Sequence, residues 1–137
     1  MPARPDLAAL VLAAGRSARM GAFKPLLPFG SHSIIEQILF TLREADVETL
    51  RVVVGWNADL LVPILERHGV AWVRNERYEE GMYSSIQAGV QSFPAGVAAF
   101  FLLPGDMPLV QGATLTRLIT EWDRQPGGIL YPRHEGK

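Results

Sequence analysis

Residues 7–24 read LAALVLAAGRSARMGAFK. The first seven of these residues are continuously apolar, which is typical of a β-strand covered on both faces. A glycine-bounded loop follows at once and carries three cations, Arg16, Arg19 and Lys24. Small residues let the main chain approach an anion, and the cations add charge that backbone N–H groups lack. The stretch therefore predicts a buried strand that leads into a phosphate-binding loop.

The composition is that of one globular domain. The chain has 137 residues, of which 48% are hydrophobic and 20% are charged, so we expect a single domain over residues 1–137. The formal net charge is -1 and no block of one sign occurs, which argues against nucleic-acid and membrane partners. The absence of cysteine excludes disulfides and thiolate metal sites. It also fits a reducing compartment, so we expect a cytoplasmic protein.

The N-terminal segment has one feature of a signal peptide, an arginine before an apolar run that ends in small residues. That run spans only about eight residues before Gly15 and the arginines, which is short for a signal core and for a membrane span. A buried strand is the preferred interpretation.

Further strands and helices alternate along the chain. The predicted strands after the first are residues 50–55, 70–73, 98–103 and 129–131, and the helical patterns cover residues 34–42, 60–65, about 83–92 and 115–122. Ser33 and Glu36 have capping-box spacing, and Gly69 suits a helix C-terminus. Asn57 is a candidate cap for the second helix, in which Pro63 requires either a late start or a kink.

Five strands alternating with four helices predict an α/β fold, a Rossmann-like open, mostly parallel sheet with helices on both faces. In such sheets ligands bind outside the carboxyl ends of the strands. The basic loop and Asp106 both follow predicted strands and should lie at that edge. The end at Lys137 is early for this fold, so we expect the domain to be incomplete at its C-terminus.

The basic loop between Ala14 and Lys24 fits neither of two common phosphate-binding motifs. It lacks the G-x-x-x-x-G-K-[ST] of a P-loop and the G-x-G-x-x-G of a dinucleotide-binding fold. Arg19 and Lys24 lie five residues apart and can hold a polyphosphate together with main-chain donors. The alternative is a solvated surface loop with incidental charges.

Asp106 is the second candidate, in the turn formed by residues 104–108 directly after a predicted buried strand. A carboxylate there suits Mg²⁺, which usually takes one or two carboxylates, waters and phosphate oxygens. The alternative is an aspartate that caps the next turn.

Asn75 and residues 81–85 form the third candidate, after a predicted strand and at the start of a helix. Gly81 permits close backbone approach, and Ser84 and Ser85 offer hydroxyls near a helix N-terminus that favours an anion or a base carbonyl. The alternative is an ordinary helix start with serine caps. All three candidates fall at one edge of one sheet, and that convergence favours a ligand site.

Two other chemistries have little support. His32, His68 and His134 lack the spacing of zinc ligands. Ser84 and Ser85 are not part of a G-x-S-x-G elbow, which argues against a hydrolase of the α/β type.

Three motifs occur together and in order: LAAGxSxRMG at residues 12–21 with Lys24 and LLP at 26–28, NxxYxxGMxSS at 75–85 followed by Gly89, and GDMP at 105–108. With them, residues 7–131 resemble the nucleotidyltransferases that make the molybdenum cofactor dinucleotides. Ala14 and Ser17 are similar to the cytidylyl branch, because the guanylyl branch usually has A-G-G at residues 13–15. Related enzymes of isoprenoid and sugar-nucleotide synthesis also open with L-A-A-G, but their later motifs differ.

The resemblance implies a nucleotide-diphospho-sugar transferase-like fold and an enzyme that uses Mg²⁺, with Mn²⁺ as an alternative. The reaction it implies is transfer of CMP from CTP to the terminal phosphate of the molybdenum-pterin cofactor, with release of pyrophosphate. A molybdoenzyme that receives the cofactor would be a further partner. By similarity, Arg19 and Lys24 would stabilise the triphosphate and the pyrophosphate, and Asp106 would hold the metal. The residues that would bind the nucleotide are Leu12, Ala13, Ala14, Gly15, Asn75, Gly81, Ser84 and Ser85.

Members of that family usually continue with a glycine-histidine-proline segment and further elements that close the acceptor pocket, whereas this chain stops at Lys137. Three alternatives therefore stay open. They are the same chemistry with GTP or with another acceptor such as a sugar phosphate or methylerythritol phosphate, a nucleotide-binding module without catalysis, and a structural domain without nucleotide affinity.

Overall fold

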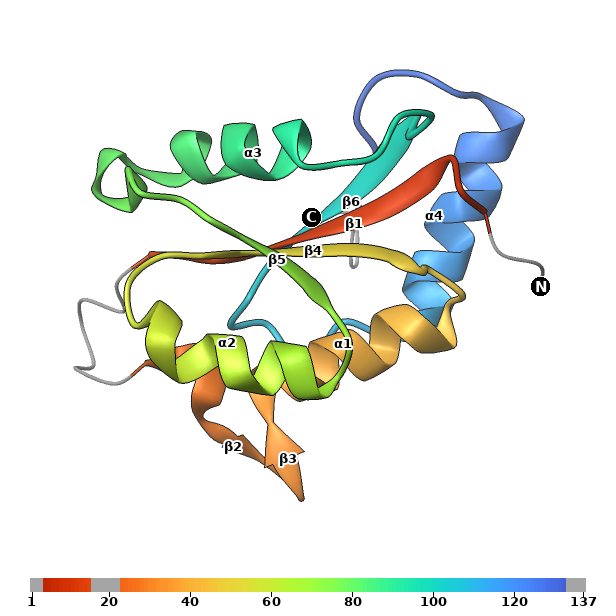
Figure 1. The fold of residues 1–137 in the computed structure, drawn as a ribbon. Helices are drawn as coiled ribbons and strands as arrows, with labels where there is room; N and C mark the ends of the chain where they lie inside the picture. Colours follow the sequence, from red (N-terminus) through yellow and green to blue (C-terminus); the bar gives the residue numbers. More distant parts are fainter. Residues whose placement is uncertain (1–3, 16–22, 133–137) are drawn as a thin grey trace.

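A four-stranded parallel sheet lies at the centre of the fold in the computed structural model, which describes residues 4–15 and 23–132 (Figure 1). The strand order is β5-β4-β1-β6 and every neighbouring pair is parallel. The strands are β1 (Leu7–Ala13), β4 (Thr49–Val54), β5 (Ala71–Arg74) and β6 (Ala99–Pro104), each within one residue of its predicted position. A short antiparallel hairpin of β2 (Pro28–Phe29) and β3 (His32–Ser33) was not predicted.

Helices cover both faces of the sheet, which confirms the predicted fold class. On one face lies α3 (Met82–Gln91), and on the other lie α1 (Ile34–Glu44), α2 (Ala58–Arg67) and α4 (Gly112–Arg124) (Figure 1). Two short 3-10 helices, η1 (Lys24–Leu26) and η2 (Tyr78–Glu80), lie in the connections that follow β1 and β5. No helix in the described part of the chain is long and apolar enough to cross a membrane.

The central strand β1 is the most deeply buried element, as its apolar sequence predicts. Residues 8–11 have no exposed surface. Ala9 belongs to the larger core cluster, beside α1 and α2, and Leu10 packs with Val53 in a smaller one beneath α3. A Cβ at Gly89 would overlap the Leu10 side chain, so α3 can pack this closely on β1 because residue 89 is glycine.

Two helix ends follow the predicted signals. At the start of α1, the Ser33 hydroxyl accepts from the Glu36 backbone N–H, and the Glu36 carboxylate accepts from the Ser33 backbone N–H at 3.0 Å. At the end of α2, Gly69 has φ of 67° and its N–H donates to the Glu66 carbonyl, while the Val70 N–H donates to the Leu65 carbonyl. Both caps are therefore confirmed.

The start of α2 differs from the prediction. Asn57 precedes the helix with a left-handed φ of 58°, and its side chain makes no capping hydrogen bond. The helix begins at Ala58 and continues through Pro63, so a late start is excluded. The carbonyl that Pro63 cannot pair belongs to Asp59, in the exposed first turn, where water can satisfy it.

The predicted strand at residues 129–131 is wrong. Ile129 and Tyr131 are 88% and 73% exposed, and neither takes part in a strand pairing of the described residues. Gly127 and Gly128 have positive φ values of 114° and 72°, so the chain turns immediately before this segment. Without a hydrogen-bonded neighbour, an apolar extended segment does not form a stable strand.

Candidate functional site

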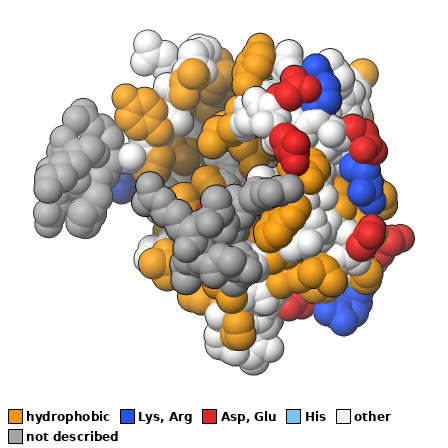
Figure 2. Space-filling model, turned by 90° about the vertical axis from the view of Figure 1, so that its left-hand side faces the viewer, with side chains coloured by type: hydrophobic (Ala, Val, Ile, Leu, Met, Phe, Trp, Pro, Cys, Tyr) orange, Lys and Arg blue, Asp and Glu red, His pale blue; other side chains and the backbone are white. Residues whose placement is uncertain are grey.

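A cleft of about 620 Å³ opens at the carboxyl edge of the sheet. Segments that follow β1, β5 and β6 meet there with η1 and the start of α3, as the predicted convergence requires. Figure 2 views the molecule from this edge, with charged side chains along one side and hydrophobic side chains over much of the rest. The described residues that line the cleft are Leu12, Ala13, Ala14, Gly15, Lys24, Pro25, Tyr78, Glu79, Gly81, Met82, Ser85, Pro104, Gly105 and Asp106.

Backbone atoms fix the part of the cleft that follows β1. The Leu12 carbonyl accepts a hydrogen bond of 2.7 Å from the Gly105 N–H, and the Ala14 carbonyl accepts one of 2.9 Å from the Trp56 N–H. A Cβ at Gly105 would lie 2.8 Å from the Leu12 oxygen, and one at Gly55 would lie 2.9 Å from the Ala14 oxygen. The two glycines therefore let the neighbouring strand ends approach the predicted nucleotide-binding backbone closely.

The structure brings Lys24 and Asp106 together at this cleft. Lys24 Nζ lies 3.9 Å from Asp106 Oδ2, and their side chains are 35% and 40% exposed. Both residues therefore remain accessible to a ligand while they face each other. Asp106 does not cap α4, since Gln111 is the residue that precedes that helix.

Asn75 is the centre of a buried polar cluster behind the cleft. Its Nδ2 donates to Ser84 Oγ at 2.9 Å and to Ser85 Oγ at 3.0 Å, and its Oδ1 accepts from the Arg77 N–H at 3.0 Å. The one hydroxyl hydrogen of Ser84 has two carbonyl oxygens within reach, that of Gly81 at 2.7 Å and that of Arg77 at 3.0 Å. Asn75, Ser84 and Ser85 are 4%, 6% and 5% exposed.

The residues predicted as the third candidate do not all line the cleft. Gly81 and Ser85 line the cleft, whereas Asn75 and Ser84 do not. Neither serine caps α3, because the residue at the cap is Gly81, with φ of 105° and no side-chain bond. The alternative of an ordinary serine-capped helix start is therefore wrong.

Some lining residues were missed from the sequence. Tyr78 and Met82 are specified positions of the motif at residues 75–85, so that motif could have predicted both as lining residues. Pro25 follows the predicted cation Lys24, and Glu79 had no sequence signal. Arg19, the second predicted catalytic cation, lies outside the described residues.

The described residues that line the cleft include two carboxylates, Asp106 and Glu79. Nowhere in residues 4–15 and 23–132 do three His, Cys, Asp or Glu side chains gather in a way that could hold a metal. Asp106 alone matches the predicted metal ligand, and such a site suits an ion that takes its remaining ligands from water and phosphate. His32 and His68 contact Gln37 and Glu36 instead.

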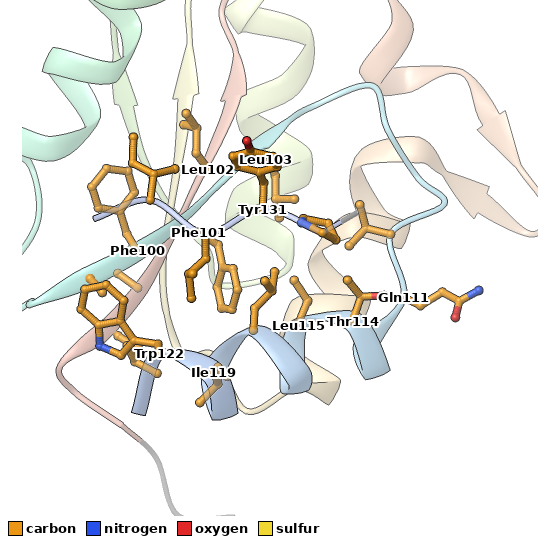
Figure 3. Close-up of a pocket in the computed structure, with 18 of the residues that line it drawn as sticks. Phe100, Phe101, Leu102, Leu103, Gln111, Thr114, Leu115, Ile119, Trp122 and Tyr131 are labelled. Atoms are coloured by element: carbon orange, nitrogen blue, oxygen red, sulfur yellow. The ribbon is translucent and has the colours of Figure 1, made fainter. Parts of the chain in front are cut away.

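A second and larger cavity, the β6–α4 groove, lies between β6, α4 and residues 128–132 (Figure 3). Its volume is about 950 Å³, and Phe101, Leu115 and Trp122 lie in the space between β6 and α4 (Figure 3). None of the described residues that line it has a charged side chain. Binding a phosphate requires cations or well-placed N–H donors, so the cleft and not this groove is the candidate site.

The fold and the cleft define an α/β domain of the nucleotidyltransferase type. A nucleotidyl transferase from Methanothermobacter thermautotroptrophicus has a TM-score of 0.75 and 29% identity, over 83% of this chain and 56% of that one. Rv0371c from Mycobacterium tuberculosis has a TM-score of 0.76 and 31% identity, over 88% of this chain and 61% of that one. The predicted Rossmann-like fold is therefore confirmed.

The chain belongs to the family of MobA-like NTP transferase domains, whose family model matches residues 9–137. A molybdenum cofactor guanylyltransferase from Xanthomonas euvesicatoria is 34% identical over 110 residues, which are 80% of this chain and 52% of that one. The bifunctional protein GlmU from Gloeobacter violaceus is 31% identical over 115 residues, 82% of this chain and 25% of that one. The chain thus spans about half or less of the length of these relatives.

Proposed function

We propose that the cleft binds a nucleoside triphosphate and that the protein transfers its nucleotidyl group to a phosphate acceptor. The observation that carries this proposal is the meeting of Lys24 and Asp106, 3.9 Å apart, beside the backbone of residues 12–15. One cation and one carboxylate next to small residues suit a triphosphate that is bound together with a divalent ion. Membership of the NTP transferase family supports the same class of reaction.

In such a transfer, an oxygen of the acceptor phosphate attacks the α-phosphorus of the triphosphate. The bond from that phosphorus to the bridging oxygen breaks, and pyrophosphate leaves with the bonding electron pair. Lys24 stabilises the negative charge on the leaving group, and we assign the same role to Arg19 by the family resemblance. The chain needs no covalent intermediate, so its task is to position the reactants and neutralise charge.

We propose Asp106 as the ligand of Mg²⁺, with Mn²⁺ as an alternative. When bound, the ion would neutralise phosphate charge. Asp106 directly follows Gly105, whose N–H donates to the Leu12 carbonyl. This bond holds the backbone beside Asp106 at the edge of the predicted nucleotide-binding segment. A structure of Rv0371c in complex with manganese, 27% identical to this chain with a TM-score of 0.70, supports this choice of ion.

We propose CTP as the nucleotide and the molybdenum-pterin cofactor as the acceptor. Ala14 lines the cleft at a position where the guanylyl branch usually has glycine, so the family resemblance supports CTP. The acceptor is supported by the 34% identical molybdenum cofactor guanylyltransferase, which at the same time makes GTP the alternative nucleotide.

The test is nucleotide binding and turnover by the same protein. We expect CTP with Mg²⁺ to raise the melting temperature, since a ligand that binds only the folded state stabilises it. Pyrophosphate should then form when the molybdenum-pterin cofactor is added. Turnover with GTP alone would replace the nucleotide assignment, and binding without product for any acceptor would indicate a nucleotide-binding module. No thermal shift with CTP, GTP or ATP would contradict the proposal.

Two substitutions test the charged pair itself. We expect Lys24→Met and Asp106→Asn each to lower turnover by roughly 100- to 1000-fold, because each removes charge stabilisation from the transition state. Circular dichroism and melting temperature should stay close to the wild type. Matched controls are Arg117→Met and Glu121→Gln on the exposed face of α4, which should leave turnover unchanged. Near-wild-type turnover by either cleft variant would remove the pair from the mechanism.

A further inference from the structure

We propose that Asn75 is a positioning residue that fixes one wall of the cleft and orients the Ser85 hydroxyl, and that it does not bind the nucleotide itself. The inference rests on the proposed function of the cleft. It differs from the role that the family resemblance implied for Asn75, which was to bind the nucleotide.

Both N–H donors of Asn75 and one lone pair of its oxygen are used inside the protein. An asparagine side chain has two N–H hydrogens and one carbonyl oxygen to offer. Both hydrogens are taken by Ser84 Oγ and Ser85 Oγ, at 2.9 and 3.0 Å, and the oxygen accepts from the Arg77 N–H at 3.0 Å. Because that N–H can only donate, it also fixes which end of the amide is the oxygen. Direct donation to a nucleotide would have to break one of these bonds.

The position of Asn75 leads to the same result. Its side chain is among the few buried polar ones, with 4% of the residue exposed, and it does not line the cleft. Its backbone N–H donates to the Val54 carbonyl at 2.8 Å, at the end of β4. Asn75 is therefore attached to the rigid sheet on one side and to the residues that do line the cleft on the other.

The segment that Asn75 holds is residues 77–81, which carry three lining residues, Tyr78, Glu79 and Gly81. Asn75 holds its first residue through the Arg77 N–H. Ser84 Oγ, which accepts from Asn75, lies 3.0 Å from the Arg77 carbonyl oxygen and 2.7 Å from the Gly81 carbonyl oxygen, so its one hydrogen is within reach of either end of the segment. The position of residues 77–81 relative to the sheet thus depends on the buried side-chain amide of Asn75.

The same amide orients Ser85, the serine that reaches the cleft. Ser85 Oγ accepts from Asn75, and a hydroxyl that accepts at a lone pair keeps its own hydrogen for donation. Because Asn75 Nδ2 occupies one side of Ser85 Oγ, the hydroxyl hydrogen of Ser85 points away from Asn75. Ser85 is itself one of the residues that line the cleft. Ser85 therefore suits donation to an oxygen of a bound nucleotide, such as a base carbonyl or a ribose hydroxyl.

A double-mutant cycle on CTP affinity tests whether Asn75 acts through its neighbours. We expect Asn75→Ala and Ser85→Ala each to raise the Kd about tenfold, which corresponds to about 1.4 kcal/mol. The double variant should be only slightly weaker than either single variant, because both remove the same oriented hydroxyl. Affinity is measured well below each melting temperature, so a loss of stability alone would not change the Kd. Additive losses of about a hundredfold, or a Kd unchanged in Asn75→Ala, would overturn the inference.

Hydrogen exchange gives a readout that does not require nucleotide. We expect the backbone amides of residues 77–81 to exchange at least tenfold faster in Asn75→Ala than in the wild type. The control is Gln91→Ala, which removes an exposed side-chain amide at the end of α3 and should leave their exchange unchanged. Unchanged exchange in Asn75→Ala would contradict the inference, whether or not the wild type binds nucleotide. Failure of the wild type to bind nucleotide would by itself contradict only the proposed function. If Asn75→Ala does not fold, Ser84→Ala removes the Ser84 bonds to Asn75 and to the carbonyls of residues 77 and 81, and it should also show faster exchange of residues 77–81.

Discussion

The cleft and the β6–α4 groove both adjoin β6, yet they differ in almost every property. The cleft lies beyond the carboxyl end of the strand and contains backbone groups, small residues and the Lys24–Asp106 pair. The groove runs along the outer edge of the same strand and has no charged side chain among its described lining residues. A strand end offers loops whose side chains and N–H groups can meet a charged ligand, whereas the described lining of the groove offers no charged group.

The size of a cavity does not show where the chemistry takes place. The groove, at about 950 Å³, is larger than the cleft, at about 620 Å³. Only the smaller cavity brings together residues from three separate connections, with charge of both signs. We therefore expect substitutions in the groove to change stability or solubility, and only substitutions in the cleft to change nucleotide affinity.

The largest effect on the groove side is expected from Leu115→Ala. Leu115 is 1% exposed, in α4 against the main core, so truncation removes buried methyl groups and leaves a cavity. We expect a loss of roughly 2 to 5 kcal/mol in the free energy of unfolding, measured by denaturant titration. CTP affinity of the folded protein should not change. Thr116→Ala, at an exposed neighbouring position, is the control, and a large change in affinity for Leu115→Ala would break the separation of the two regions.

A smaller effect should come from Glu36, which lies in neither region. Hydrogen bonds from the Ser33 backbone N–H, from His68 and from the Ser33 hydroxyl lower the pKa of Glu36 from 4.5 to about 2. Because the folded-state pKa is lowered, this stabilisation is present above about pH 5 and is lost as the pH falls towards 2. It amounts to something on the order of 3 kcal/mol.

Urea titrations at several pH values check this expectation. Stability should fall between pH 5 and pH 2 less steeply in Glu36→Gln than in the wild type, and Glu44→Gln, exposed at the other end of α1, should behave as the wild type. Parallel curves for Glu36→Gln and the wild type would assign the acid sensitivity to other carboxylates.

The smallest effect is expected at the exposed rim of the groove. Leu102 on β6 is 44% exposed, and β6 has only β1 as a strand partner in the described part of the chain. An uncharged apolar edge strand is prone to aggregation, so Leu102→Lys should raise the solubility limit while changing the free energy of unfolding by less than about 0.5 kcal/mol. Leu60→Lys, on the exposed side of α2, should raise it less. A weaker CTP affinity in Leu102→Lys would show that the groove and the cleft are coupled.

Local signals made most of the fold predictable. The apolar run at residues 7–13 is a strand covered on both faces, and the Ser33–Glu36 spacing is a capping box, because both depend on side chains close in sequence. The prediction for residues 129–131 was wrong because a strand forms only where its backbone pairs with a neighbouring strand, and no local pattern specifies that pairing. Asn57 occupies the N-cap position of α2 as predicted, but with a left-handed φ of 58° its side chain makes no capping hydrogen bond.

The sequence by itself determined the α/β class, the family and the edge of the sheet at which the candidate site lies, since alternating apolar periodicity and strand ends are local properties. Only the tertiary structure decided which polar residues face a ligand. It placed Lys24 beside Asp106, and it turned Asn75 and Ser84 inward while Ser85 reached the cleft. The physical reason is that a buried amide must satisfy all its hydrogen bonds, and its partners come from turns and helix ends whose approach is set by packing.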